Sequence, residues 1–123
     1  MNRALLVAVL LSIGAPASHA AAQDYAFMGL GSSSCSKFAE LMRMSPDRTE
    51  SEYFDWAQGF MSGMNLIRLS STPRIPSKNL NSMSVDAQKR YLRNYCDQHP
   101  LSDLVKGILE LYDSLPLSPL PRP

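Results

Sequence analysis

The number and position of the cysteines constrain the fold of this chain more than any other feature. The chain contains two cysteines, Cys35 in its first third and Cys96 in its last third. Two cysteines allow one intramolecular pairing, so an oxidising compartment would join distant parts of the chain covalently. In the chain-entropy model, closing so long a loop stabilises the folded state by about 4 kcal/mol. The compartment therefore decides whether the fold is cross-linked.

The beginning of the chain contains an apolar run that is too short to span a membrane. Arg3 is followed by the apolar residues 4–13 ("ALLVAVLLSI"), which are in turn followed by glycine, proline and small residues. A membrane span requires roughly twenty apolar residues. The run also lacks the polar face of an amphipathic anchor. A positive start, a short apolar core and small residues are typical of a secretory signal peptide.

The small residues after the apolar run fit a cleavage site. Ala20 and Ala22 both satisfy the spacing of small residues that signal peptidases require. We therefore predict a signal peptide at residues 1–22 and a periplasmic or secreted product. Because such compartments are oxidising, we also predict a Cys35–Cys96 disulfide.

The charge of the processed chain is close to zero. The full chain has 12 Lys and Arg residues against 11 Asp and Glu residues. Cleavage removes Arg3 and His19, so basic and acidic residues balance and His99 becomes the one histidine left. A neutral protein is not steered towards nucleic acid or anionic membranes. We therefore expect no nucleic-acid partner and no stable membrane anchor.

The periodicity of apolar residues predicts an all-α fold. Apolar residues recur at helical spacing in four segments, at residues 35–44, 49–69, 84–98 and 101–115. No segment alternates apolar and polar residues over the length of a strand. We predict a single domain at residues 23–115, a small bundle of about four helices cross-linked by one disulfide. Residues 116–123 contain four prolines and are predicted to form an extended, solvated tail.

Side chains that can cap helices precede these segments. One of residues 32–34, all serines, is predicted to cap the first helix, Ser84 the third and Ser102 the fourth. Thr49 and Glu52 have the spacing of a capping box, which predicts that the second helix begins there.

The second helix contains two unusual groups of residues. Gly59 and Gly63 lie one turn apart, which predicts the close approach of another backbone, since each glycine costs about 1 kcal/mol inside a helix. Tyr53, Phe54 and Trp56 cannot all face one direction, because consecutive helical residues are about 100° apart. We predict that at least one of them, Phe54, is exposed or covers a neighbouring loop. The apolar stripe is predicted to comprise Tyr53, Trp56, Ala57, Phe60, Met64 and Ile67.

The connector between the second and third helices is long for a small domain. Residues 70–83 contain two prolines and many small polar residues and have no apolar period. Such a connector is either a solvated crossover or a functional loop. We select Arg74, Ile75 and Lys78 within it, together with Phe54, as candidate partner-binding residues.

The chain has few residues that could support catalysis. Asp97 and His99 lie close in sequence, but the chain lacks a Gly-x-Ser-x-Gly nucleophile motif. His99 precedes a proline and is expected to end a helix. The cysteines lack the Cys-x-x-Cys spacing of redox enzymes. We predict that the protein is not an enzyme and has no catalytic residues and no cofactor.

Metal binding is also not expected. One histidine and a disulfide-bonded cysteine pair do not supply a zinc site. The Met42–Met44 and Met61–Met64 spacings could suit Cu(I), but methionine at these positions is equally typical of an adaptable core.

Two segments carry a resemblance to known families. The segments are "WAQGFMSGMN" at residues 56–65 and "YLRNYCDQHPLSDLVKGILEL" at residues 91–111. With Gly59, the Tyr91–Leu92 pair and Pro100, they resemble the Rap/Tai-type immunity family of periplasmic proteins, which neutralise secreted effectors. In size, export, helix content and one long-range disulfide, the chain is also similar to the HdeA-type acid-stress chaperones.

These resemblances imply a non-enzymatic periplasmic module that binds proteins. The partner would be a secreted effector if the immunity resemblance applies. The alternative is an acid- or envelope-stress chaperone, whose partners would be unfolded clients.

Overall fold

The fold consists of helices joined by turns and one long connector. The computed structural model describes residues 28–119, so the predicted signal peptide and the end of the proline-rich tail lie outside the described residues. The predicted all-α class is confirmed, because four α-helices pack together and residues 28–119 contain no strand. The elements are the 3-10 helix η1 (Leu30–Ser32) and the helices α1 (Cys35–Met44), α2 (Pro46–Ser70), α3 (Val85–Gln98) and α4 (Leu104–Ser114).

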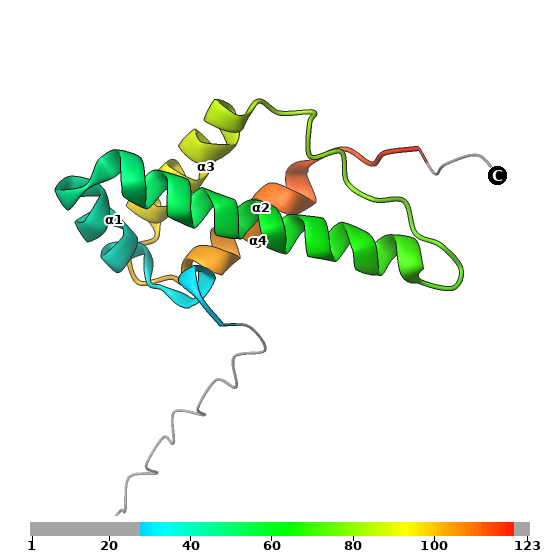
Figure 1. Ribbon diagram of the computed structural model, residues 1–123, viewed down its shortest axis with the longest axis horizontal. Coiled ribbons are helices and arrows are strands. Elements are labelled where there is room, and N and C mark those ends of the chain that lie inside the picture. Colours follow the sequence, from blue (N-terminus) through cyan, green and yellow to red (C-terminus); the bar gives the residue numbers. More distant parts are fainter. Residues whose placement is uncertain (1–27, 120–123) are drawn as a thin grey trace, which may run out of the picture.

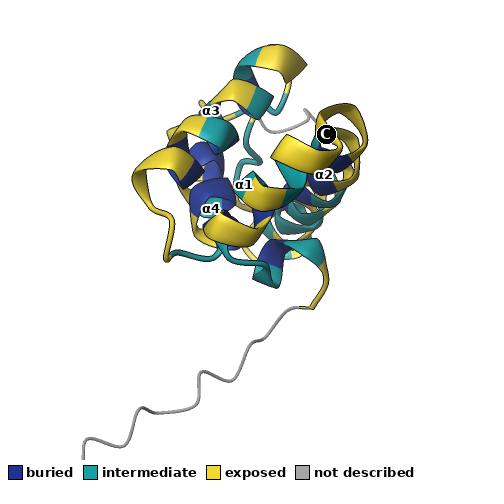
Figure 2. Ribbon diagram, turned by 90° about the vertical axis from the view of Figure 1, so that its left-hand side faces the viewer, coloured by how far each residue is buried: buried dark blue, intermediate teal, exposed yellow. Residues whose placement is uncertain are grey.

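Helix α2 runs along the long axis of the molecule (Figure 1). Helix α1 packs against both α2 and α3, while α4 packs against α3, α2 and η1. The last turns of α2 extend beyond α3 and α4, towards the end where the connector and the start of the tail lie (Figure 1). Buried residues gather where the inner faces of the helices meet (Figure 2).

The predicted Cys35–Cys96 disulfide is confirmed. It joins the first residue of α1 to the last part of α3 across 61 residues, and both cysteines are buried. The backbone N–H of Cys35 also donates to the Ser102 carbonyl at 2.7 Å. The start of α1 is therefore fixed to α3 by a covalent bond and to the α3–α4 turn by a hydrogen bond.

The apolar core draws on all four helices. Helices α2 and α4 contribute four buried residues each. The side chains with the lowest exposure in this core are Cys35, Ala57, Met61, Leu104, Ile108, Leu111 and Tyr112. The Gln88 side chain is also buried, and its amide nitrogen donates to the carbonyls of Leu80 and Met83.

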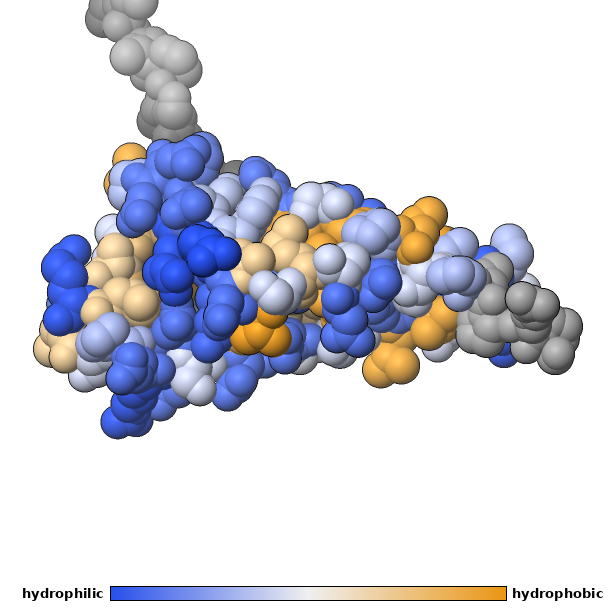
Figure 3. Space-filling view, turned by 90° about the horizontal axis from the view of Figure 1, so that it is seen from above, coloured by the Kyte–Doolittle hydropathy of each residue, from blue (hydrophilic) through white to orange (hydrophobic). Residues whose placement is uncertain are grey.

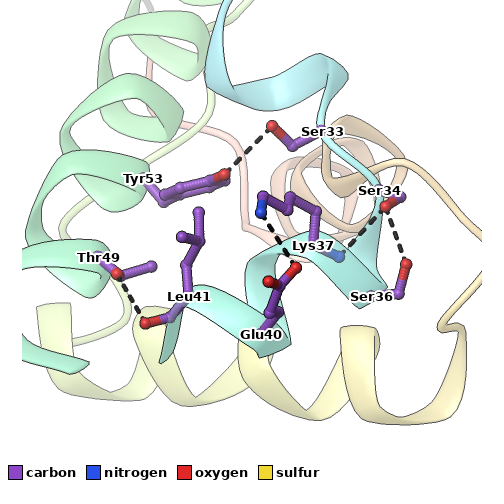
Figure 4. Close-up of polar contacts among 8 residues, drawn as sticks. All are labelled: Ser33, Ser34, Ser36, Lys37, Glu40, Leu41, Thr49 and Tyr53. Carbon is purple, nitrogen blue, oxygen red and sulfur yellow. Dashed lines mark hydrogen bonds and ion pairs between the residues drawn. The ribbon is translucent and has the colours of Figure 1, made fainter. Parts of the chain in front are cut away.

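Two of the predicted helix caps are confirmed. The Ser34 hydroxyl accepts a hydrogen bond from the Lys37 N–H at 3.2 Å (Figure 4). The Ser84 hydroxyl accepts from the Ala87 N–H at 3.3 Å. Each satisfies one N–H group that a helix start leaves free.

The predicted start of α2 at Thr49 is wrong. Helix α2 begins at Pro46, because the ring of proline fixes a helical φ and its missing N–H is not needed in the first turn. Thr49 is buried inside the helix, where its hydroxyl donates to the Leu41 carbonyl at 3.1 Å (Figure 4). This bond ties the second turn of α2 to the end of α1.

The predicted cap of α4 is also wrong. Helix α4 begins at Leu104 with Asp103 in the cap position. The Ser102 hydroxyl instead forms a hydrogen bond with the Tyr95 hydroxyl at 3.0 Å. Ser102 thus links the α3–α4 turn to α3.

The predicted close approach at Gly59 and Gly63 is not found. A Cβ atom at either position would meet nothing within 4 Å in the described part of the chain. Close approaches occur at Gly31, against the ring of Trp56, and at Gly107, against the ring of Tyr95. The glycines that packing requires therefore meet aromatic rings and not another backbone.

Candidate functional site

The structure overturns the prediction that Phe54 is exposed. Its side chain is 5% exposed, and the Lys89 ammonium lies 5.6 Å from the centre of its ring. Phe54 faces α3, whereas Trp56 lies against η1. Because α2 has neighbours on both sides, nearby aromatic residues can point in different directions and still be covered. Phe54 is therefore a core residue.

Lys78 holds the connector to the end of α4. Its ammonium donates to the carbonyls of Asp113 at 2.8 Å and Leu115 at 2.9 Å. These carbonyls lie at a helix C-terminus, where a cation is favoured. The position predicted as a partner-binding lysine thus has a structural role.

Asn65 ties the connector to α2. Its side-chain oxygen accepts from the Lys78 N–H at 2.7 Å, and its side-chain nitrogen donates to the Lys78 carbonyl at 2.9 Å. The same oxygen accepts from the Tyr112 hydroxyl at 2.7 Å. Burial raises the pKa of Tyr112 above its ordinary value, because an ionised phenol would lose hydration there.

The beginning of the proline-rich tail is paired with the connector. Asn79 N–H donates to the Pro116 carbonyl at 2.8 Å, and Ser118 N–H donates to the Ser77 carbonyl at 2.7 Å. The prediction of a fully solvated tail is therefore wrong for its first residues. The pairing brings Leu117 beside Lys78.

The connector also folds back on the last turn of α2. The Ile75 N–H donates to the Arg68 carbonyl at 3.0 Å, and the Arg68 Nε donates to the Pro76 carbonyl at 2.7 Å. The end of α2, the connector and the start of the tail therefore meet at one end of the molecule.

Large apolar side chains are exposed at this end. Leu66 is 65% exposed, Ile67 73%, Ile75 43% and Leu117 55%. Figure 3 shows hydrophobic residues towards the right-hand end of the molecule. We call Leu66, Ile67, Arg74, Ile75 and Leu117 the distal surface. Arg74 and Ile75 were predicted from sequence, and both are exposed.

Sequence reasoning missed Leu66, Ile67 and Leu117. Ile67 continues the apolar stripe of α2, and the sequence therefore predicts it to be buried. The stripe is correct up to Met64, but at Ile67 the helix has passed beyond the body that covers it. The available signal in the sequence was two aliphatic residues in succession, Leu66 and Ile67, close to the connector.

The neighbourhood of His99 forms a second surface feature. A groove of about 270 Å³ lies between α3 and α4 and is lined by Tyr91, Asn94, Tyr95, Gln98, His99 and Glu110. The His99 ring lies 4.6 Å from that of Tyr95, at the C-terminus of α3. Burial, with a smaller effect of the Glu110 carboxylate, raises the pKa of Tyr91. Asp97 lines a different groove, between α1 and α3, so the structure does not bring it together with His99.

The described part of the chain also bears on metal binding and on membrane insertion. Across residues 28–119, no three His, Cys, Asp or Glu side chains lie close enough together to hold a metal ion. Of the methionines considered for Cu(I), Met61 is buried and Met44 is 71% exposed. No helix between Met28 and Pro119 combines the length and apolar character needed to cross a membrane.

Comparison with protein-family models, with curated proteins and with solved structures finds no match to this chain.

Proposed function

We propose that the chain is an exported, non-enzymatic protein-binding module that contacts its partner through the distal surface. Its scaffold would be of the immunity or HdeA type, and the partner would be a secreted effector that the module neutralises. The observation that carries this proposal is the gathering of four exposed aliphatic side chains, with Arg74, at one end of the bundle. The other large exposed apolar side chains of residues 28–119 lie on separate elements: Met28, Met44, Val85 and Leu101.

The physical reason is the cost of exposing apolar area to water. Each aliphatic side chain that a partner removes from water contributes about 1.5–3 kcal/mol when the burial is complete. Exposed apolar groups that gather in one place mark interaction sites, whereas scattered ones do not. The disulfide supports export, since such bonds persist in oxidising compartments.

The distal surface is rigidly supported by the fold. Asn65 and Lys78 fix the connector to α2 and α4, so Arg74 and Ile75 project from a defined backbone. A pre-organised surface loses less conformational entropy on binding than a mobile loop. The connector is thus suited to protein recognition.

Site-specific cross-linking tests this proposal. A photoreactive residue placed at Ile67 should cross-link a periplasmic protein in the producing cells. The matched control is Leu101, which is 95% exposed and lies in the α3–α4 turn, at the opposite end of the molecule (Figure 1). The protein captured at Ile67 should bind the purified chain, and Ile67→Ser should weaken that binding while Leu101→Ser does not. Equal cross-linking at both positions, or binding that Ile67→Ser leaves unchanged, would contradict the proposal.

A second candidate function is that of an acid-stress chaperone. The observation that favours it is the pairing of the Glu50 carboxylate with Arg93 and, at 3.8 Å, with Lys89. This cluster ties α2 to α3, and protonation of the carboxylate would remove it. Acid would then loosen the bundle while the disulfide still holds α1 to α3.

A further inference from the structure

The distal end of the molecule has an uneven charge. The chain has no Asp or Glu between Trp56 and Val85, although it has three basic residues there: Arg68, Arg74 and Lys78. Asp113, at the end of α4, brings one carboxylate to this end. The near-zero charge of the whole chain therefore conceals a local positive excess.

Of the basic residues that the structure describes at this end, Arg74 is the one whose side chain makes no hydrogen bond and no ion pair. Lys78 directs its ammonium at two backbone carbonyls, and Arg68 uses Nε to bind another. Arg74 is exposed, and between residues 28 and 119 it has no ion pair and no side-chain hydrogen bond. Its neighbour in sequence, Ile75, is an exposed aliphatic residue.

We propose that the partner presents to the distal surface an apolar protein segment that carries a carboxylate, which pairs with Arg74. This inference rests on the proposed function and specifies the chemistry of its partner. Burial of the aliphatic side chains would supply the affinity. The guanidinium would supply the specificity, because it binds a carboxylate through two parallel hydrogen bonds.

The charge count favours a protein over a membrane. Each basic residue near an anionic membrane contributes about 1 kcal/mol, and recognition of such membranes uses clusters of about four to eight basic residues. Within residues 28–119, the cation that the distal surface offers is Arg74, beside a few aliphatic side chains. Arginine beside apolar side chains is instead typical of protein interfaces.

The charge count also disfavours a second copy of this chain as the partner. Two copies joined through their distal surfaces would bring Arg74 of each close to the basic residues of the other. Like charges that face each other across an interface cost free energy. The partner is therefore expected to supply the carboxylate that this end largely lacks.

A titration with two matched peptides tests the inference. Both peptides carry leucines at helical spacing, with Glu at the remaining positions of one peptide and Lys at those of the other. The ¹⁵N-labelled protein should show shifts of the amide signals of residues 66–75, with about tenfold tighter binding of the Glu peptide, the effect of one good ion pair. Arg74→Glu should reverse the preference. Arg90→Glu, at an exposed position in α3, is the control and should leave the preference unchanged.

Every other outcome overturns the inference. Equal or tighter binding of the Lys peptide would reject the proposal that a carboxylate of the partner pairs with Arg74. Shifts produced by vesicles of phosphatidylglycerol and phosphatidylcholine, with neither peptide binding, would identify a membrane surface as the occupant. Concentration-dependent broadening without any peptide would identify a second copy, and no response to any probe would reject the distal surface as a docking site. If cross-linking at Ile67 succeeds while the charge preference fails, only the partner chemistry is rejected and the proposed function stands.

Discussion

At the scale of single residues, Tyr112 joins the core to the connector. It is 1% exposed, and its hydroxyl donates to Asn65, which in turn holds Lys78. Tyr112→Phe should lower the free energy of unfolding by about 1 kcal/mol, the usual net contribution of a hydrogen bond. Asn65 keeps its bonds to the Lys78 backbone, so the loss should not be larger. Urea denaturation near neutral pH measures this change.

Tyr112 should also make the stability of the fold depend on pH in the alkaline range. Burial raises the pKa of Tyr112 above its ordinary value, so the folded state resists ionisation more than the unfolded state does. The neutral phenol's contribution to the free energy of unfolding is complete below about pH 10. This contribution is lost as the pH rises from there towards the folded-state pKa. The decline in stability above about pH 10 should therefore be shallower in Tyr112→Phe than in the unaltered protein. Identical slopes would show that this phenol does not govern the decline.

At the scale of elements, α2 contains two glycines that packing within the described chain does not require. A Cβ at Gly59 or Gly63 would meet nothing within 4 Å there, and alanine is favoured over glycine inside a helix by about 1 kcal/mol. Gly59→Ala and Gly63→Ala should therefore each raise the free energy of unfolding by up to about 1 kcal/mol. Gly107→Ala is the matched control in α4, where the new Cβ would lie 2.5 Å from Cδ1 of Tyr95 and should destabilise the fold. Thermal unfolding of the three variants separates these effects, and destabilisation by all three would contradict the expectation.

The elements also show which features the sequence could predict. Four helical segments, a serine cap within residues 32–34, the cap at Ser84 and the disulfide depend on local chemistry or on a unique pairing, and these predictions are confirmed. The predicted caps at Thr49 and Ser102 are wrong. The exposure of Phe54 and Ile67 depends on which neighbours flank α2 and on where the body of the bundle ends. The sequence of one helix shows neither its neighbours nor where the rest of the bundle ends. For the same reason the sequence missed Leu66 and Leu117. It did select Arg74 and Ile75, both of which are exposed.

At the scale of the whole molecule, ionic and covalent links join the helices in different ways. The Glu50 cluster ties α2 to α3 through charge, whereas the disulfide ties α1 to α3 through a covalent bond. Protonation of the carboxylate in acid removes the first and leaves the second. It also leaves the chain strongly positive, which favours expansion.

If the protein is an acid-stress chaperone, it should open at about pH 2–3, where carboxylates are protonated, and an equimolar amount should suppress the aggregation of an unfolded client. Glu50→Gln removes the charge of this link at every pH, so this variant should open under milder acid than the unaltered protein. A variant with both cysteines replaced by serine should open as well but lose the covalent link that keeps the opened chain compact. Near-UV circular dichroism follows the opening, and light scattering of the client follows the suppression.

A protein that opens in acid without suppressing aggregation would exclude the chaperone function. The neutral-pH binding proposed for the distal surface would be unaffected by that result, because the distal surface lies on the end of α2 and the connector, whereas the Glu50 cluster lies in the second turn of α2 and in α3.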